Sequence, residues 1–259
     1  MTNVSSKLNN QDLVLLAKKN YENSQRAKTP GTIVTLPSHG LVYSESSILR
    51  SNSIEMRFMT AYDEDILTNS SYLKEGVIFK KLLESLILTP GIQPDDLTVS
   101  DQDKLIIAAR IHAYGPIYPV LVEDPKTGAK LSREVDLSKL QHKPFALVPN
   151  KDGEFEYASS DNSIQLKFKF ITAKETSLIG EDNALSKLME LSITEINGNR
   201  DTTAIIQFLK FEMRAIEAKN FRNYLTTNSP GINYNVQFEG EDGGTFDASF
   251  RLQADLFWF

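Results

Sequence analysis

The 259-residue chain contains no cysteine, and this absence excludes several kinds of site at once. Disulfides, thiol nucleophiles, iron–sulfur clusters and thiolate zinc sites all need the missing thiol. Histidine is also scarce, and His39, His112 and His142 lie far apart in the sequence. An imidazole metal site is therefore not expected, and the sequence predicts no metal and no other cofactor.

Charge and hydropathy exclude further classes of partner. Lysine and arginine total 28 against 34 aspartate and glutamate residues, which gives a net charge of -6. Such a chain has no cationic field to attract nucleic acid or anionic lipid. No run approaches the roughly 20 apolar residues that cross a bilayer, and residues 1–10 lack the apolar middle of a secretory signal. We therefore expect a protein of the cytosol or of a soluble assembly, with no nucleic-acid or membrane partner.

Two segments share the alternating pattern of a half-buried strand. Residues 54–61 and 166–173 align without gaps at an offset of 112 (166 minus 54), and each contains a threonine, Thr60 or Thr172, placed to cap a following helix. Similar elements follow each copy, as expected after an internal duplication.

The expected elements follow from apolar periodicity and from proline and glycine stop signals. After the first strand they are helices over 74–88 and 100–114 and hairpin strands over 118–123 and 130–136. After the second they are helices over 184–193, 202–211 and 216–227 and hairpin strands over 234–239 and 245–252.

This pattern predicts an α+β protein made of two related strand–helix–helix–hairpin halves. A helical extension over 10–28 precedes them. The predicted units are the extension at 1–31, a first half at 32–150 and a second half at 151–259. A polar stretch over 140–161 reads as the surface linker between the halves.

Both ends of the sequence carry apolar side chains suited to binding another protein. Leu13 and Leu16 lie on the short apolar stripe of the expected extension, which docks on its own protein or on a partner. Phe257, Trp258 and Phe259 place three aromatic residues together. They either pack into the protein's own core or form a hydrophobic plug for another subunit, because aromatic side chains concentrate binding energy at interfaces. These five residues are the candidate partner-binding residues.

Acidic clusters offer an alternative chemistry. One spans 63–65, and the other includes Asp95, Asp96, Asp101 and Asp103. Clustered carboxylates can bind a hard divalent cation or act as general acid and base, as in a metal-dependent hydrolase. Each cluster falls at or just before the first turn of an expected helix, where negative charge complements the helix dipole. The dipole interpretation is favoured, so no catalytic or metal-binding residue is predicted.

Six short motifs, spread over 32–259, are informative in combination. They are Leu36-Pro37-Ser38-His39-Gly40, Phe58-Met59-Thr60-Ala61 leading to Asp63-Glu64, Asp95-Asp96-Leu97, Ala113-Tyr114-Gly115, Pro230-Gly231-Ile232 and Phe257-Trp258. Together they resemble the baseplate-hub assembly family of T-even-like contractile-tailed bacteriophages.

The resemblance implies a non-enzymatic tail morphogenesis protein that assists assembly of the baseplate central hub. In that role it would be an assembly factor or chaperone for a hub or tape-measure protein. The alternative that it leaves open is a structural subunit retained in the mature baseplate. The implied partners are other phage tail proteins, including baseplate hub subunits. The implied location is the host cytoplasm during assembly, or the virion tail baseplate.

Members of that family often carry a Cys-Pro-x-Cys-Gly knuckle in their hairpin turns, where thiolates from two knuckles hold zinc. Here Asp124 and Thr127 stand at the cysteine positions of the first turn, and Gly240 and Gly243 at those of the second. The tight turns can survive, because proline fixes one dihedral angle and glycine permits a positive φ. The resemblance thus implies a degenerate zinc knuckle without metal, held by ordinary packing.

Overall fold

The protein is described here by a computed structural model, which covers residues 29–252 and 256–258. Within these residues, helices are combined with small antiparallel sheets, three of two strands and one of three. This confirms the predicted α+β class. None of the helices in the described ranges is long and apolar enough to cross a membrane. The expected helix over 10–28 lies outside the described residues.

The first half begins with a two-stranded sheet and ends with a hairpin. Its elements are β1 (Gly31–Thr35), η1 (Ile48–Ser51), β2 (Ser53–Arg57), α2 (Ala61–Leu67), α3 (Ser70–Glu75), α4 (Ile78–Leu86), η2 (Pro94–Asp96), α5 (Val99–Tyr114), β3 (Ile117–Glu123), β4 (Lys130–Asp136) and η3 (Leu137–Lys139). The paired strands β1 and β2 are antiparallel, as are β3 and β4.

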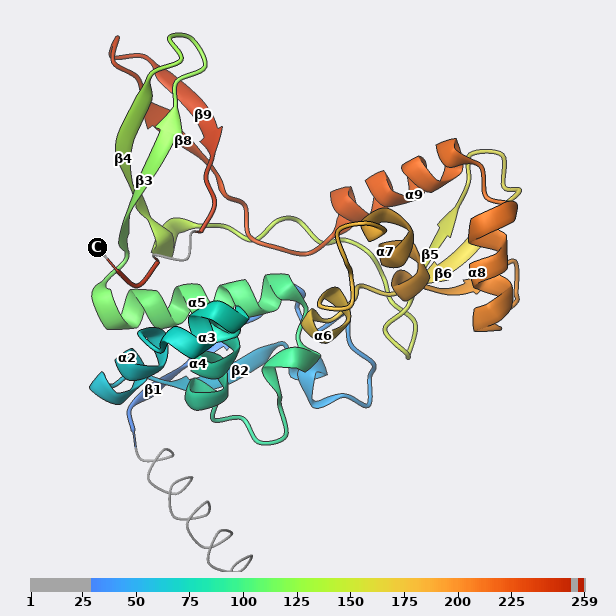
Figure 1. Ribbon diagram of the computed structural model, residues 1–259, viewed down its shortest axis with the longest axis horizontal. Helices are drawn as coiled ribbons and strands as arrows, with labels where there is room; N and C mark the ends of the chain where they lie inside the picture. The colour runs from blue at the N-terminus through green and yellow to red at the C-terminus, as the bar shows by residue number, and fades with distance from the viewer. Residues whose placement is uncertain (1–28, 253–255, 259) are drawn as a thin grey trace, which may run out of the picture.

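Helix α5 is the central element of this half and confirms the helix expected over 100–114 (Figure 1). Thr98 caps it, because the Thr98 hydroxyl accepts a hydrogen bond from Asp101 N at 3.3 Å. Its apolar residues Leu105, Ile106 and Ile107 are buried, which places the helix in the core. Helices α2, α3 and α4 lie on one side of α5 and the hairpins on the other (Figure 1).

The single helix expected over 74–88 is wrong, because two short helices occupy this region. Helix α3 ends at Glu75, and Gly76 caps it in the left-handed conformation with φ 68°. Helix α4 ends at Leu86, before the predicted stop at Pro90, because Ile87 becomes extended and pairs with Met56 of β2.

The second half has a three-stranded sheet in the order β5-β6-β7, followed by helices and a hairpin. Its elements are β5 (Phe155–Ala158), β6 (Gln165–Phe168), α6 (Ala173–Thr176), α7 (Ala184–Ser192), β7 (Ile193–Ile196), α8 (Thr202–Phe211), α9 (Ala215–Asn228), β8 (Asn235–Glu239) and β9 (Thr245–Ser249). The helices agree with those expected from the sequence to within one or two residues.

Two strands of this sheet were not expected. Strand β5 lies inside the stretch over 140–161 that the sequence predicts to be a surface linker, and its Phe155 is buried. It forms a hairpin with the next strand, β6. Strand β7 follows α7 without a loop, because Ile193 pairs with Phe168 of β6. Tertiary pairing, rather than local propensity, decides β7.

Corresponding helix caps and strand pairings occur in the same order in the two halves. Thr60 precedes α2 and Thr172 precedes α6, and each forms a capping box with an acidic residue three positions later. Met56 pairs with Ile87, and Phe168 pairs with Ile193. Met56 and Phe168 are separated by 112 positions (168 minus 56), the offset of the sequence alignment. Descent of the halves from a duplicated ancestor, and the unit boundaries given above, stay predictions.

The hairpins β3–β4 and β8–β9 come from different halves and lie side by side (Figure 1). We call residues 117–136 and 235–249 together the arm, since they project from the rest of the molecule in Figure 1. The inner faces of the arm bury one side of each strand, with Tyr118, Val120, Val122, Leu131, Phe238 and Phe246 in its core.

Candidate protein-interaction site

The turns at the tip of the arm lie against each other. Asp124 is only 1% exposed, and its Oδ1 accepts a hydrogen bond from Lys126 N at 2.8 Å. In the other turn, Asp242 Oδ1 accepts a hydrogen bond from Gly244 N at 2.9 Å. Lys126 Nζ reaches between the turns to 3.4 Å from Asp242 Oδ2. A Cβ atom on Gly240 would lie 3.0 Å from Asp124 Oδ2, so the missing side chain leaves room for this carboxylate.

The four knuckle positions do not supply the ligands of a structural zinc site. Asp124 offers one carboxylate, Thr127 one hydroxyl, and Gly240 and Gly243 offer no side chain. The Thr127 hydroxyl already accepts a hydrogen bond from Ala129 N at 3.2 Å. Structural zinc takes four thiolate or imidazole ligands in most proteins. The residues present therefore do not fit the metal, and packing and the Lys126–Asp242 ion pair join the two turns.

Arg110 anchors the C-terminal segment to the base of the arm. This residue of α5 is fully buried, and its Nε donates to the carbonyl of Leu256 at 2.8 Å. Its Nη1 donates to the carbonyl of Gly115 at 2.6 Å, and its Nη2 to that of Ile117 at 3.1 Å. A buried guanidinium is stable only when its donors are used in this way. The side chain thus joins three segments: the end of α5, the start of β3 and residue 256.

The structure places two of the predicted partner-binding residues. Phe257 is 4% exposed, with its ring 6.1 Å from that of Phe79 and 6.3 Å from that of Tyr114. Of the two alternatives for this residue, packing into the protein's own core is the one that the structure shows. Trp258 is 36% exposed and remains available to a partner. Leu13, Leu16 and Phe259 lie outside the described residues.

An exposed apolar row on the arm was missed by the sequence analysis. Ile117 is 45% exposed and Leu121 is 62% exposed, on the face of β3 opposite to buried Val120. The two side chains share one face of the strand, with exposed Pro119 between them, so this face presents apolar groups to solvent. A signal for this surface was present in the sequence. Strand β3 carries apolar residues at both odd and even positions, but a hairpin that packs on one face only can bury just one of these two sets.

The first acidic cluster is used within the fold. Asp63 forms a bidentate ion pair with Arg57, with Nη1–Oδ2 and Nη2–Oδ1 distances of 2.7 Å. Ser85 Oγ donates to Asp63 Oδ1 at 2.8 Å. Burial opposes ionisation of Asp63, but the hydrogen bonds from Arg57, the Thr60 backbone and Ser85 outweigh it and lower the pKa of the carboxyl. Asp63 therefore lies in the first turn of a helix, as the dipole interpretation expects, and it also forms a buried ion pair with Arg57.

The second cluster is spread over several contacts. Asp95 pairs with Lys80. Asp101 accepts hydrogen bonds from Ser38 Oγ at 2.7 Å and from Tyr43 Oη at 2.5 Å. Within the described residues, no group of three or more histidine and acidic side chains is placed to hold a metal ion.

The fold brings two of the three histidines together despite their separation in the sequence. The ring centroids of His39 and His142 are 6.0 Å apart, edge to face. Burial, followed by the charge of Lys104, lowers the pKa of His142. The third histidine, His112, is exposed and lies against Phe58 with a centroid distance of 4.7 Å.

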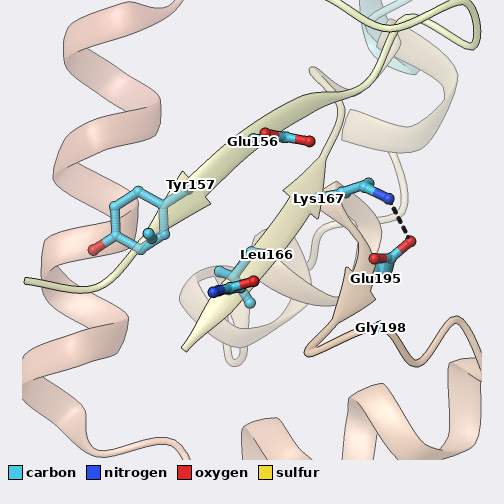
Figure 2. Close-up of a pocket in the computed structure, with 8 residues that line it drawn as sticks. Glu156, Tyr157, Leu166, Lys167, Glu195 and Gly198 are labelled. Carbon is cyan, nitrogen blue, oxygen red and sulfur yellow. Dashed lines mark hydrogen bonds and ion pairs between the residues drawn. The ribbon is translucent and has the colours of Figure 1, made fainter. Parts of the chain in front are cut away.

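An open groove of ≈ 380 Å³ follows the outer face of the β5-β6-β7 sheet (Figure 2). Glu156, Lys167 and Glu195 come from neighbouring positions on its three strands. Lys167 Nζ lies 2.9 Å from Glu195 Oε2, as the dashed line in Figure 2 marks. Arg200 Nε also lies 2.9 Å from the same oxygen. Lys167 of this groove is thus paired with Glu195, and the arrangement offers an ordinary polar surface.

Comparison with protein families identifies the class of protein. The family described as T4 bacteriophage base plate protein matches residues 36–257. The chain therefore belongs to this family, and a bacteriophage baseplate role follows, together with contacts to other phage tail proteins. A search of curated proteins and a search of solved structures gave no match.

The match confirms the resemblance to T-even-like phage proteins found in the sequence. The family is one of structural or assembly proteins of the virion tail.

Proposed function

We propose that this protein is a non-enzymatic tail morphogenesis factor that assists assembly of the baseplate central hub through protein–protein contacts. The observation that carries the proposal is the baseplate family match over residues 36–257. Its partners would be hub subunits, with the tape-measure protein as a further partner, and it would act in the host cytoplasm while tails are being built.

The arm supports a role in binding. It projects from the body of the protein (Figure 1), and its exposed Ile117 and Leu121 form an apolar row. Arg110 holds Ile117 and Leu256 through their carbonyls, so the C-terminal segment with Trp258 lies beside the base of the arm. We propose Trp258, Ile117 and Leu121 as the side chains that contact a tail protein. Leu13, Leu16 and Phe259 remain proposed contacts without a described position.

Complementation of a phage that lacks the gene tests the proposal. We expect wild-type protein to restore infectious particles and Trp258→Ala, or the pair Ile117→Ser and Leu121→Ser, to restore far fewer. Glu156→Gln, on the distant sheet groove, is the control and should complement fully. Normal tail assembly without any form of the protein would refute the proposal.

A structural subunit of the finished baseplate is the second candidate, because the family match supports it equally. The two are separated by the protein content of purified particles. An assembly factor should be absent or present in far less than one copy per hub, whereas a structural subunit should be present in a fixed copy number.

A further inference from the structure

A cavity of ≈ 360 Å³ opens where the two halves meet. Its walls come from the first turns of α5, from residues 170–176 and from residues 229–234. Ala173 N donates to Leu97 O at 2.7 Å, and Lys143 N donates to Gly231 O at 2.8 Å. These backbone hydrogen bonds fix the walls to one another, so the cavity is a formed feature of the fold.

Asp103 lines this cavity and forms no ion pair in the part of the chain that the structure describes. Asp101, one half-turn earlier on α5, has its oxygens occupied by Ser38 and Tyr43. Among the described residues, Asp103 has neither a hydrogen bond nor an ion pair, although Lys143 lines the same cavity. Asp103 is partly exposed in the cavity. Burial of its carboxyl raises the pKa to about 6, so near pH 7 the carboxylate is mostly charged.

A second polar group at this cavity is also unsatisfied. The Tyr234 hydroxyl is buried and has no hydrogen-bond partner. Burial, and then the charge of Asp103, raise the pKa of Tyr234, which places the two groups within electrostatic reach of each other. Unsatisfied buried polar groups are rare in native proteins, and an ordered water, an ion or a ligand can complete their hydrogen bonding.

The rest of the lining favours a ligand with an apolar stem. Phe170, Ile171, Pro230 and Ile232 contribute apolar surface beside Asp103. A ligand that matches this lining has a cationic head to pair with the carboxylate and a short hydrocarbon chain behind it. Lysine and arginine side chains have this construction.

We propose that the cavity receives a lysine or arginine side chain of a partner protein, whose cationic head pairs with Asp103 while its aliphatic stem lies against Phe170 and Ile232. The identity of that partner as a tail protein rests on the function proposed above. Recognition of the side chain itself does not, because it depends only on the residues that line the cavity.

Titration of the isolated full-length protein with short peptides tests the inference. The probes are acetyl-Gly-Lys-Gly-amide, acetyl-Gly-Arg-Gly-amide, the same peptide with norleucine at its centre, and spermidine. Binding is followed by amide chemical shifts in NMR spectra, and the Asp103 carboxyl is followed by its carbon shift as a function of pH.

At least one of the two basic peptides should shift amides in 98–103 and 229–234 in a saturable manner. The bound cation should lower the pKa of Asp103 by about 1–3 units. In Asp103→Asn, the affinity should fall about tenfold, as expected for loss of one charge-assisted contact. Asp96→Asn, an exposed neighbour on η2, is the matched control and should bind normally.

Several results would overturn the inference. They are equal binding of the norleucine peptide, unchanged affinity in Asp103→Asn, no saturable shift with either basic peptide, and binding of spermidine alone, which would indicate a polyamine site. If Asp103→Asn does not fold, the titration of Asp103 in wild-type protein still decides the test, because a bound basic peptide must lower the pKa of this carboxyl. Because tail assembly is not measured, this proposal and the proposed function can fail independently.

Discussion

Arg57 and Asp63 form a buried, bidentate ion pair between the end of β2 and the first turn of α2. The corresponding pair in the second half is Lys169 and Glu175, at the same offset of 112 (169 minus 57, and 175 minus 63). Both pairs use the acidic residue of a capping box, but the second pair is partly exposed. In both halves, therefore, an ion pair links the residue after or at the end of a strand to the first turn of the next helix, but the first pair is buried and the second is partly exposed to water.

This difference leads to the first prediction. Asp63→Asn should lower the free energy of unfolding by about 3 kcal/mol, because it leaves the Arg57 guanidinium buried without its counter-charge. Glu175→Gln should lower it by about 0.5–1 kcal/mol, since exposed ion pairs contribute little. Urea denaturation of the two variants beside wild type measures both values. Equal losses would show that burial does not distinguish the pairs.

The second prediction concerns acid stability and Glu154. Burial opposes ionisation of Glu154, but hydrogen bonds from Arg200 and Asn150 outweigh it and lower the pKa to about 2 from an ordinary 4.5. Because the pKa is lower in the folded state, the carboxylate stabilises the protein above pH 4.5. That contribution is lost as the pH falls from 4.5 to 2.

Glu154→Gln should therefore reduce stability at pH 7 by about 2 kcal/mol, a value below full linkage because Arg200 is half exposed to solvent. The variant should lose less further stability than wild type between pH 4.5 and pH 2. Urea denaturation at three pH values within this range measures the slope. Glu156→Gln, an exposed residue of the same strand, is the control and should keep the wild-type slope.

The third prediction separates the core from the contact surface at the C-terminal segment. Phe257→Ala should lower the free energy of unfolding by about 3–4 kcal/mol, because it leaves a cavity between α4 and α5. Trp258→Ala should cost about 1 kcal/mol or less, since much of its ring already faces solvent. Thermal unfolding gives the ranking. If Trp258→Ala were the more damaging change, the assignment of Trp258 to a partner contact would be withdrawn.

The fourth prediction tests how closely the arm's turns correspond to a zinc knuckle. Replacing Asp124, Thr127, Gly240 and Gly243 together by cysteine should create a tetrathiolate site, because the two turns already face each other. Gly243 has φ 77°, so its replacement should itself cost about 1 kcal/mol. Zinc at a thousandfold excess over its dissociation constant should then stabilise the variant by about 4 kcal/mol.

Cobalt spectroscopy checks this outcome, since four thiolates give tetrahedral Co²⁺ a visible absorption. Wild-type protein should show neither the absorption nor a change of melting temperature with zinc. If wild-type protein bound zinc stoichiometrically, the conclusion that these four residues cannot hold the metal would be wrong. If the four-cysteine variant bound no zinc, the two turns would not have the geometry of a zinc knuckle.

Local signals in the sequence were sufficient for much of the fold. The Gly115-Pro116 pair defines the end of α5, and the turn residues at 124–128 and 240–244 define the arm's hairpins, so these elements were predicted closely. Gly76 was a readable break in the helix expected over 74–88, but the apolar periodicity on both sides concealed it. Strand β5 forms a hairpin with β6 across the polar turn at 159–163, which was a local signal left unused. Strand β7 pairs with β6 from a position after α7, and such pairing has no local signature.

The candidate site was less accessible to sequence reasoning. The four knuckle positions were found by resemblance, but the ion pair between Lys126 and Asp242 joins residues 116 positions apart. Arg110 stood in a helix expected to be apolar, and nothing local indicates that its donors are used by three carbonyls. The exposure of Ile117 and Leu121 depends on which face of the arm is covered, which only the packing of the two hairpins decides.

The hydrogen bond from Arg110 to Leu256 spans 146 positions, and this separation has a consequence during translation. At a synthesis rate of about 5–20 residues per second, roughly 7–30 s pass between the appearance of these two residues. Throughout this interval Nε of Arg110 does not yet have its Leu256 acceptor, and the place that Phe257 fills beside Phe79 and Tyr114 is empty. Folding of the first half on the ribosome is therefore completed only after residues 256 and 257 have been synthesised.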